Sequence, residues 1–586
     1  MAEQQKLKGK EVFRTYFVTS EEDPKFHTCR ECSKAVKQDL TKGYNNLISH
    51  VTCSHKDDCF ERVRVACGVA SGPMDTFVRK STEKAKNIFG WMDWIVTENL
   101  PLLCCENKNY RKRSNLGVLT TKTLKKYMRM MKRNIFEIIK KRAPPTYGLI
   151  IDGWSTGSQH FFAIFITWTN EISDLVEEYL IFFGVSEDVD EHTEFEDISD
   201  DLKKFGFTAA DWFDIICLAL NEVFGNVTED TRINIENFAQ VVEFISADNC
   251  STNTKLCSDS GVPMKGCDSH RLNLAVLEML GPEEKKNRAG AVVQQASTMQ
   301  ALTLKLDRCM GSLKTLKNSS LLRTKTHLRA ERRNKTRWSS LYNMIKKWSK
   351  IRDKVAAIEM WGEDMLDLIP DAAENRKLSE YLQKLGHFES VSKKLQGSGE
   401  NRMTVFKARE ILDVLITDHG NEFPLTAIKK DAAIIQNKHF ENGIFKIQAG
   451  LESDMDGRER SAVKIFLKPR AGVVLMRPVP GEDEDYATRA LNNAEEQKRR
   501  RLSSSNYRST NHVSPTTNVV ERANSQAKLI MSDRRESMAP ETLNMLMILK
   551  LNACLWPNES SIQKILDSDD FRDPELESDS EEDDDA

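Results

Sequence analysis

Three short apolar segments decide the fold: YGLIIDGWS at 147–155, HFFAIFITW at 160–168 and EYLIFFGV at 178–185. Each is rich in β-branched and aromatic residues, and polar, turn-like residues separate them, so we expect three consecutive antiparallel strands. An amphipathic helix, TAADWFDIICLALNEVFG at 208–225, and a buried strand, VVEFISADN at 241–249, come next. This order predicts a mixed α/β sheet.

Two aspartates stand at the ends of these strands. We expect Asp152 to end the first strand and Asp248 the fourth. Like charges a few ångströms apart raise each other's pKa unless a cation lies between them. Mg²⁺ or Mn²⁺ prefers oxygen ligands, and a third carboxylate would complete a two-metal site of the kind that cleaves and joins phosphodiesters. The alternative is that each aspartate only caps a helix or a turn.

The rest of the chain after the sheet is mainly helical in pattern. Nearly everything from 281 to 496 is typical of helix, most clearly TRWSSLYNMIKKWSKIRDKVAAIEMW at 336–361. A polar, basic segment then leads to two amphipathic helices, within 519–531 and 537–556. The basic cluster Lys498, Arg499, Arg500 and Arg501 in that segment indicates nuclear import or a solvated loop with equal weight.

A zinc-type spacing occurs near the N-terminus. In KFHTCRECSKAVKQDLTKGYNNLISHVTCSH, Cys29 and Cys32 are followed by His50 and His55, and Cys53 competes with His55 for the fourth position. A segment this short needs metal to fold, and such fingers commonly contact DNA. Free cysteines beside surface histidines are the alternative.

A basic amphipathic helix is expected at 122–142, where nine Lys or Arg residues oppose one acidic residue. Such a face is either solvated or bound to DNA, and we give the two possibilities equal weight. The candidates for DNA contact are Lys125, Lys126, Arg129, Lys132 and Arg133.

Composition and charge narrow the function classes. The 586 residues are 40% hydrophobic and 30% charged, with no apolar run long enough for a membrane span and no signal peptide, so we expect a cytosolic or nuclear protein. The 13 cysteines are expected to be free thiols apart from the metal site. The last 20 residues carry a net charge of −11, which leaves +8 on the preceding 566. A basic body suits a polyanionic partner, and the acidic tail shields that surface or only solubilises the chain.

Five motifs, taken together and in order, resemble the hAT superfamily of DNA transposases with an N-terminal BED-type zinc finger. They are DGWST at 152–156, SADNCSTN at 246–253, CDSHRLNLAV at 267–276, TRWSSLYNM at 336–344 and the segment from TTNVVERANSQ to NACLW at 516–556. The resemblance runs from Glu11 to Trp556. It implies a ribonuclease H-like catalytic domain interrupted by an all-helical insertion. It also makes Asp152, Asp248 and Glu521 the metal-binding DDE triad.

The resemblance assigns further roles. Cys267 and His270 match a CxxH motif associated with the DNA end, or they are a packing element. Trp338 matches a tryptophan that is a candidate to stack on a flipped base, or it is an ordinary core residue, and Arg337 could contact phosphate. In place of Asn524 the family usually has an aromatic residue.

The expected organisation has six parts. These are a BED-type finger at 10–60, a helical DNA-binding and dimerisation region at 61–143, the first part of the catalytic domain at 144–280, the helical insertion at 281–497, the returning part with hAT dimerisation helices at 498–566, and a disordered acidic tail at 567–586.

The expected function is that of a nuclear DNA transposase that holds Zn²⁺ in its finger and Mg²⁺ or Mn²⁺ in its active site. It would bind the terminal repeats of a transposon and its target DNA, cut by hydrolysis and transfer a 3′-hydroxyl; the family pattern adds a hairpin on flanking DNA. Synapsis of two ends needs a homodimer or a higher homo-oligomer. The alternatives are a transposase-derived DNA-binding protein or transcription regulator that does not cut, and a structural nuclear scaffold.

Overall fold

The structure is a computed structural model, and it describes most of the chain. The described residues are 12–13, 16–19, 25–29, 34–39, 43–54, 82–156, 159–170, 173–185, 208–225, 232–281, 285–286, 292–294, 297–334, 338–468, 505–531, 538–556 and 559–567. They divide into two compact units, Met1–Thr82 and Glu83–Ala586, and each is described by itself. Among the described helices, none is both long and apolar enough to cross a membrane.

The first unit is a small antiparallel sheet with one helix. Strands β1 (Phe17–Thr19), β2 (Phe26–Cys29) and β3 (Ala35–Lys37) pair in that order, and helix α2 (Asn45–Ser54) follows. A core this small rarely holds a fold together without help from a metal or disulfide. Its fully buried apolar residues are Val12, Tyr16, Phe17, Cys29, Leu47 and Val51.

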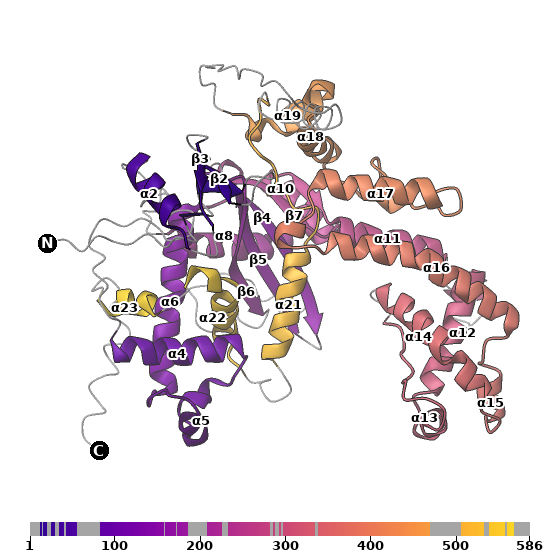
Figure 1. Cartoon of the computed structure of the whole chain (residues 1–586). Coiled ribbons are helices and arrows are strands. Elements are labelled where there is room, and N and C mark those ends of the chain that lie inside the picture. The colour runs from indigo at the N-terminus through magenta and orange to yellow at the C-terminus, as the bar shows by residue number, and fades with distance from the viewer. Residues whose placement is uncertain are drawn as a thin grey trace. The chain divides into compact units, whose positions relative to one another are not determined.

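The second unit is built on a five-stranded mixed sheet of order β6-β5-β4-β7-β8 (Figure 1). The strands are β4 (Tyr147–Thr156), β5 (Gln159–Thr169), β6 (Val176–Val185), β7 (Val242–Ala247) and β8 (Met264–Gly266). Strands β4, β5 and β6 are antiparallel, whereas β4, β7 and β8 run parallel. The predicted mixed α/β sheet is therefore confirmed.

Two details of the sheet differ from the prediction. Strand β4 does not end at Asp152 but continues to Thr156, because the hairpin with β5 pairs every residue from Gly148 onward. Strand β8 was not predicted, because three residues, one of them a lysine, give no apolar pattern.

Helices from both ends of the chain cover this sheet. Helix α22 contacts β6 and α6, and α21 contacts β4 and β5, so the C-terminal helices complete the core that the first strands begin. The elements are α4 (Glu83–Thr97), η2 (Leu102–Cys105), α5 (Lys108–Arg113), α6 (Thr121–Arg142), α8 (Ala209–Phe224), α9 (Phe238–Val241), α10 (Ser251–Ser260), α11 (Asp268–Leu280), α21 (Asn518–Ile530), α22 (Pro540–Leu551), η9 (Ala553–Leu555) and α23 (Ser560–Asp567).

Local sequence explains where the predicted helices begin. Thr208 caps α8 in a capping box with Asp211, each side chain bonding the other residue's backbone amide. Thr120 caps α6 by accepting a hydrogen bond from the Thr123 amide. Helix α6 then buries an apolar stripe that includes Leu124, Met128, Met131, Ile135 and Ile139. Helix α6 therefore belongs to the core of the second unit and is not a separate module.

Between α11 and α21, the described residues are mainly helical, as predicted, with two short strands among them. The elements are β9 (Lys285–Lys286), β10 (Val292–Gln294), α12 (Thr298–Ser312), α13 (Leu316–Arg323), α14 (Ser339–Ala356), α15 (Glu363–Leu366), α16 (Ala372–Leu395), η5 (Gly399–Asn401), α17 (Val405–His419), η6 (Thr426–Ile428), α18 (Lys438–Ala449), η7 (Glu452–Asp454), α19 (Gly457–Ala462) and η8 (Lys464–Phe466). Helices α11 to α17 bury a second hydrophobic core, in which Leu306, Trp348 and Phe388 are central.

Candidate active site

Three parallel strands bring three polar side chains to one edge of the sheet. The register pairs Ile150 of β4 with Ser246 of β7, and Ala247 of β7 with Gly266 of β8. Asp152 and Asp248 each lie two residues beyond a paired position, and Cys267 directly follows β8. Because side chains alternate along a strand, the two aspartates share a face. The predicted meeting of the aspartates at adjacent strands therefore follows from the register.

Thr517 joins these groups from the far end of the chain. Its Oγ1 lies 3.3 Å from Asp152 Oδ2, 3.5 Å from Asp248 Oδ1 and 3.4 Å from Cys267 Sγ. The hydroxyl has one proton, so it can donate to one carboxylate at a time. Sequence reasoning missed Thr517. Its position before α21 is typical of a helix cap, but its side chain makes no capping hydrogen bond, which leaves it directed at the acids.

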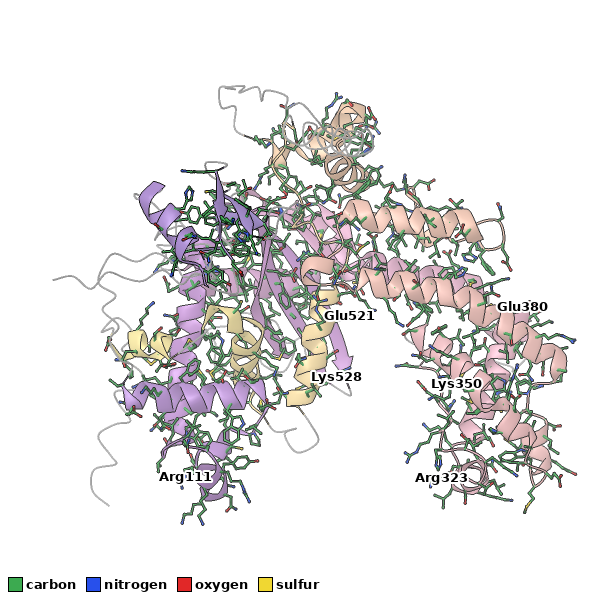
Figure 2. The ribbon with its side chains drawn as sticks, viewed as in Figure 1. Arg111, Arg323, Lys350, Glu380, Glu521 and Lys528 are labelled. Atoms are coloured by element: carbon green, nitrogen blue, oxygen red, sulfur yellow. The ribbon has the colours of Figure 1, made fainter. Side chains whose placement is uncertain are left out.

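Glu521 lies in the first turn of α21, four residues after Thr517, and so on the same side of the helix (Figure 2). Its charge reaches Asp152. The pKa of Asp152 lies well above its usual range, first because of desolvation, then because of the negative charges of Asp248 and Glu521. The three predicted acids therefore gather in one region, although they come from β4, the end of β7 and α21.

His270 and Cys267 belong to the same site. His270 lies in the first turn of α11, with Nδ1 3.2 Å from Asp248 Oδ2, and this hydrogen bond raises the pKa of the imidazole. The Cys267 thiol is buried, and burial and the charge of Asp248 raise its pKa far above its usual value. It therefore stays protonated. In the CxxH pair, His270 therefore bonds Asp248 and favours its charged form, whereas Cys267 lies beside the acids as a neutral thiol.

The donor chemistry of this site fits a hard divalent cation. Carboxylate oxygens dominate it, and the crowding that raises the pKa of Asp152 is relieved when positive charge enters. In the described part of the chain, no group of three or more Cys, His, Asp and Glu side chains is arranged as metal ligands. Asp152 and Asp248 are held together by Thr517, and Glu521 interacts with Asp152 through its charge.

A balanced cluster of charges is buried beside the acids. Lys265 of β8, Asp268 and Arg271 of α11, and Glu441 of α18 are each at most 10% exposed. Asp268 Oδ1 lies 3.2 Å from Lys265 Nζ and 3.1 Å from Arg271 Nη1, and Glu441 Oε2 lies 3.3 Å from the same Nη1. Two positive and two negative groups therefore join the site's helix α11 to the insertion.

The predicted basic face of α6 is partly used inside the protein. Arg129 pairs with Glu541 of α22 at 3.0 Å, and Lys132 pairs with Glu222 of α8. Lys125 is half-buried, whereas Lys126 and Arg133 are exposed. DNA that binds this face would therefore compete with the ion pairs of Arg129 and Lys132.

The insertion tryptophan lies in a core. Trp338 is 7% exposed and packs in the second hydrophobic core at the start of α14, and its amide donates to Asn273 Oδ1 at 3.3 Å. This matches the alternative of a core residue, because a stacking platform needs an open ring face. Arg337 lies outside the described residues.

The zinc ligands are only partly described. Cys29 ends β2 and is fully buried, and its amide donates to Lys34 O at 3.0 Å. His50 lies in α2, with its ring 5.7 Å from that of Phe17. Cys32 and His55 lie outside the described residues, as does the side chain of Cys53. The four-ligand set stays a prediction.

The C-terminal apolar stripe is already buried within the chain. Leu543, Met545, Leu546 and Leu549 of α22 are all at most 4% exposed, in the core with β6 and α6. These side chains serve the fold, so a dimer interface would need other residues. The basic cluster at 498–501 and the tail beyond 567 lie outside the described residues.

These contacts are the basis on which the site can be interpreted. No protein-family model matches the chain, and no curated protein matches it in a sequence search.

Proposed function

We propose that this protein is a metal-dependent DNA transposase of the hAT type, which cleaves and transfers phosphodiester bonds at the carboxylate site. The observation that supports the proposal is that the Thr517 hydroxyl lies within 3.5 Å of both Asp152 and Asp248, while the charge of Glu521 acts on Asp152. A fold has no structural need for three acids gathered so that burial and the charges of Asp248 and Glu521 raise the pKa of Asp152. Crowded carboxylates of this kind are typical of sites that hold divalent metal.

We also propose a ribonuclease H-like fold for the sheet domain. Its support is the antiparallel β4-β5-β6 meander, followed by parallel β7 and β8 with helices between them. The acids lie on the two central neighbours, β4 and β7, and the third comes from a helix after the insertion. That arrangement is the one that the resemblance implies.

The residues of this chain have separate tasks in the reaction. Asp152, Asp248 and Glu521 would hold Mg²⁺ or Mn²⁺, which supplies Lewis acidity to activate water or a 3′-hydroxyl and to stabilise the leaving oxygen. Thr517 keeps Asp152 and Asp248 within hydrogen-bonding distance of one hydroxyl group. His270 holds a proton at Nδ1 against Asp248. Hydrolysis forms a new P–O bond from water, breaks the bond to the leaving oxygen and leaves a 3′-hydroxyl and a 5′-phosphate.

Partners follow from the same proposal. Double-stranded DNA, as terminal repeats and as target, would contact the zinc finger and the exposed Lys126 and Arg133 of α6. The net charge of +8 before the acidic tail favours a polyanion. Joining two DNA ends requires a homodimer or a larger homo-oligomer, and the substrate requires a nuclear location.

The experiment that tests the proposal mixes the purified full chain with its own terminal-repeat DNA and Mg²⁺ or Mn²⁺. We expect strand cleavage, with loss of cleavage in Asp152→Asn, Asp248→Asn and Glu521→Gln. Asp259→Asn is the matched control, because Asp259 is an exposed acid on α10 that pairs only with the exposed Lys255 among the described residues.

Two outcomes would contradict the proposal. Intact DNA in every divalent metal, with the protein folded, would leave a DNA-binding protein or transcription regulator. DNA binding that does not change with salt, or no binding, would leave a structural scaffold, since phosphate contacts depend on salt.

A further inference from the structure

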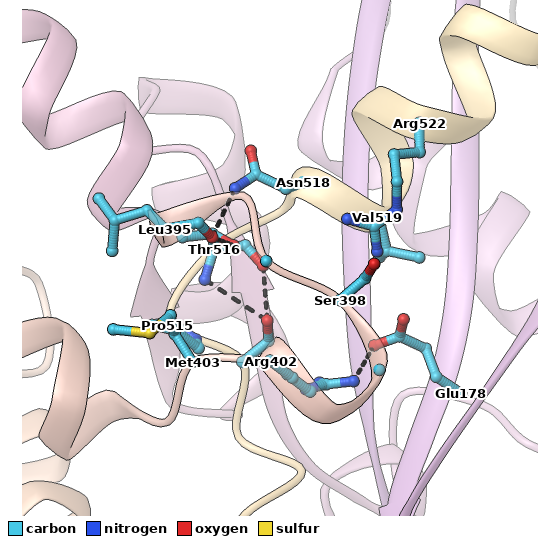
Figure 3. A pocket seen from close by; sticks show the side chains of 13 residues that line it. Glu178, Leu395, Ser398, Arg402, Met403, Pro515, Thr516, Asn518, Val519 and Arg522 are labelled. Carbon is cyan, nitrogen blue, oxygen red and sulfur yellow. Dashed lines mark hydrogen bonds and ion pairs between the residues drawn. The ribbon is translucent and has the colours of Figure 1, made fainter. Parts of the chain in front are cut away.

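A cavity lies against the first turn of α21, which contributes Asn518, Val519 and Arg522 to its lining (Figure 3). Its volume is about 80 Å³. By this measure a water needs about 10–15 Å³, so a tetrahedral group of five non-hydrogen atoms has room. Four chain segments line it: Glu178 of β6, the loop from Leu395 to Met403, residues 514–516, and Asn518 to Arg522.

Arg402 in this cavity has unused hydrogen-bond donors. Its Nη1 donates to Glu178 Oε2 at 2.6 Å, but its Nε and Nη2 are buried and have no partner among the described residues. Buried charged donors are rarely left unpaired, because desolvation is then not compensated. The group that would complete Arg402 is therefore a hydrogen-bond acceptor.

The charges around the cavity favour an anion. The side chain of Arg402 is balanced by Glu178, so Arg522, which has no ion pair among the described residues, adds a positive charge to the lining. Arg522 is exposed and reaches from α21 toward the loop, where its Nη1 lies 3.5 Å from Gln396 O (Figure 3). The positive end of the 13-residue helix α21 points the same way.

The loop opposite α21 is a tight turn that the sequence fixes. Gly399 has φ of +58°, which favours glycine, and a Cβ on Gly397 would meet Asn401 O at 2.2 Å. The loop therefore brings backbone close to the cavity, beside the Ser398 side chain. Two guanidinium groups, a hydroxyl and a helix N-terminus together match phosphate, which arginine recognises in forked geometry.

We infer that this cavity is a phosphate subsite, which holds a phosphodiester of the DNA strand next to the one that lies at the acids. The choice of DNA rests on the proposed function, whereas binding of phosphate does not. One helix turn links the two places: Thr517 contacts Asp152 and Asp248, and Asn518 and Arg522 line the cavity. A strand that crosses the acids would therefore meet the cavity at a neighbouring phosphate.

The first arm of the test uses inorganic phosphate. Thermal melting of the full chain is followed in phosphate and in chloride at equal ionic strength. We expect phosphate to raise the melting temperature of the wild type. We expect no such rise in Arg522→Gln, nor in the double variant Glu178→Gln/Arg402→Gln, which removes the buried charges together so that neither is left unpaired. Lys528→Gln, an exposed position later on the same helix, is the matched control and keeps the rise.

The second arm measures binding of labelled terminal-repeat duplex as salt is varied. Arg522→Gln should weaken binding about tenfold and lower the slope of log affinity against log salt by about 0.9, the value for one phosphate contact. Lys528→Gln should leave the slope unchanged.

Each outcome decides the inference. A phosphate effect that persists in both cavity variants overturns it. A phosphate effect that is lost in both, with an unchanged DNA slope in Arg522→Gln, overturns the assignment to DNA in favour of free phosphate. Failure of DNA cutting in every metal overturns the proposed function, but it does not affect the conclusion on phosphate binding that the melting experiment gives.

Discussion

Two clusters of charge lie next to each other at the end of β7 and β8, and they are built on opposite principles. The cluster of Lys265, Asp268, Arg271 and Glu441 is balanced and almost wholly buried. The second cluster, formed by Asp152, Asp248 and Glu521, carries only negative charge, and His270, the Thr517 hydroxyl and the Gly153 amide are among the groups that offset it. The first cluster can stabilise the fold without any further group, because its charges balance. The charges of the second cluster balance only when further positive charge is added. Charge imbalance, rather than burial, therefore separates the candidate site from the scaffold beside it.

The largest expected effect comes from exchanging an acid in each cluster. Asp248→Asn should lower DNA cutting at least about a thousandfold without lowering the melting temperature, because it removes a proposed metal ligand and one repelling charge. Asp268→Asn should destabilise the protein and leave cutting by the folded fraction within about tenfold. Cutting assays on both, normalised to folded protein, make the comparison. If Asp248→Asn and Asp268→Asn lower DNA cutting equally, the two clusters do not differ in their role in cutting.

Breaking the balanced cluster should cost the most stability. Arg271→Ala leaves Asp268 and Glu441 short of a partner, so we expect the free energy of unfolding to fall by about 3–5 kcal/mol. Urea denaturation measures it. Lys255→Ala, which breaks an exposed pair with Asp259, is the control and should change stability by less than about 0.5 kcal/mol.

Thr517→Val tests the group that holds the acids together. It keeps the shape of the side chain but removes the hydroxyl, so we expect the metal-free protein to lose about 1–2 kcal/mol of stability, and Mn²⁺ to restore part of it. Thr517→Ser, which keeps the hydroxyl, should behave like the wild type. If the Thr517→Val and Thr517→Ser variants have the same free energy of unfolding, both with and without Mn²⁺, Thr517 serves only to pack the start of α21.

Asp152→Asn should stabilise the metal-free protein by about 1 kcal/mol at neutral pH. The folded-state pKa of Asp152 is raised, so the folded state favours the protonated acid and loses stability once pH exceeds the carboxyl's ordinary range. The gain from the substitution should therefore be small at pH 4 and grow as pH rises. Urea denaturation across that range measures it, and a gain that does not change with pH would contradict it.

The smallest effect concerns His270. Its pKa is raised in the folded state by Asp248, so its contribution is fully present below its unfolded pKa and is lost as pH rises through its folded value. His270→Gln should therefore cost about 0.5–1.5 kcal/mol at pH 5.5 and almost nothing at pH 9. Nuclear magnetic resonance titration of the wild-type imidazole provides a direct check. The titration is then repeated with saturating Mg²⁺ that is free of Mn²⁺, and we expect Mg²⁺ to lower the pKa of His270. If Mg²⁺ leaves the pKa of His270 unchanged, His270 does not sense the proposed metal site.

The sequence predicts what depends on local pattern. The antiparallel strands, α8 with its threonine cap, and the helical character of the insertion all follow from periodicity and turn residues, and the structure confirms them. The approach of Asp152 to Asp248 also follows, because adjacent strands fix their register.

The sequence cannot predict what depends on distant contacts. Nothing local shows that Lys265 is 1% exposed, because one of its two partners, Glu441, lies far along the chain. The position of Arg402 beside Glu178, which lies 224 residues earlier, has the same cause. Trp338 could not be assigned to a core or a surface, since an amphipathic helix does not reveal which of its faces a later helix covers.

The bond between Thr517 and Asp152 spans 365 residues. Contacts this distant close large loops and form late, because the entropy of the intervening chain must be lost first. A growing chain that has already formed its sheet and insertion would thus hold Asp152 and Asp248 together, but it would still lack Thr517 and Glu521. Under the proposed function, DNA cutting would begin only when the final helices dock, so a prematurely ended translation product should not cut DNA.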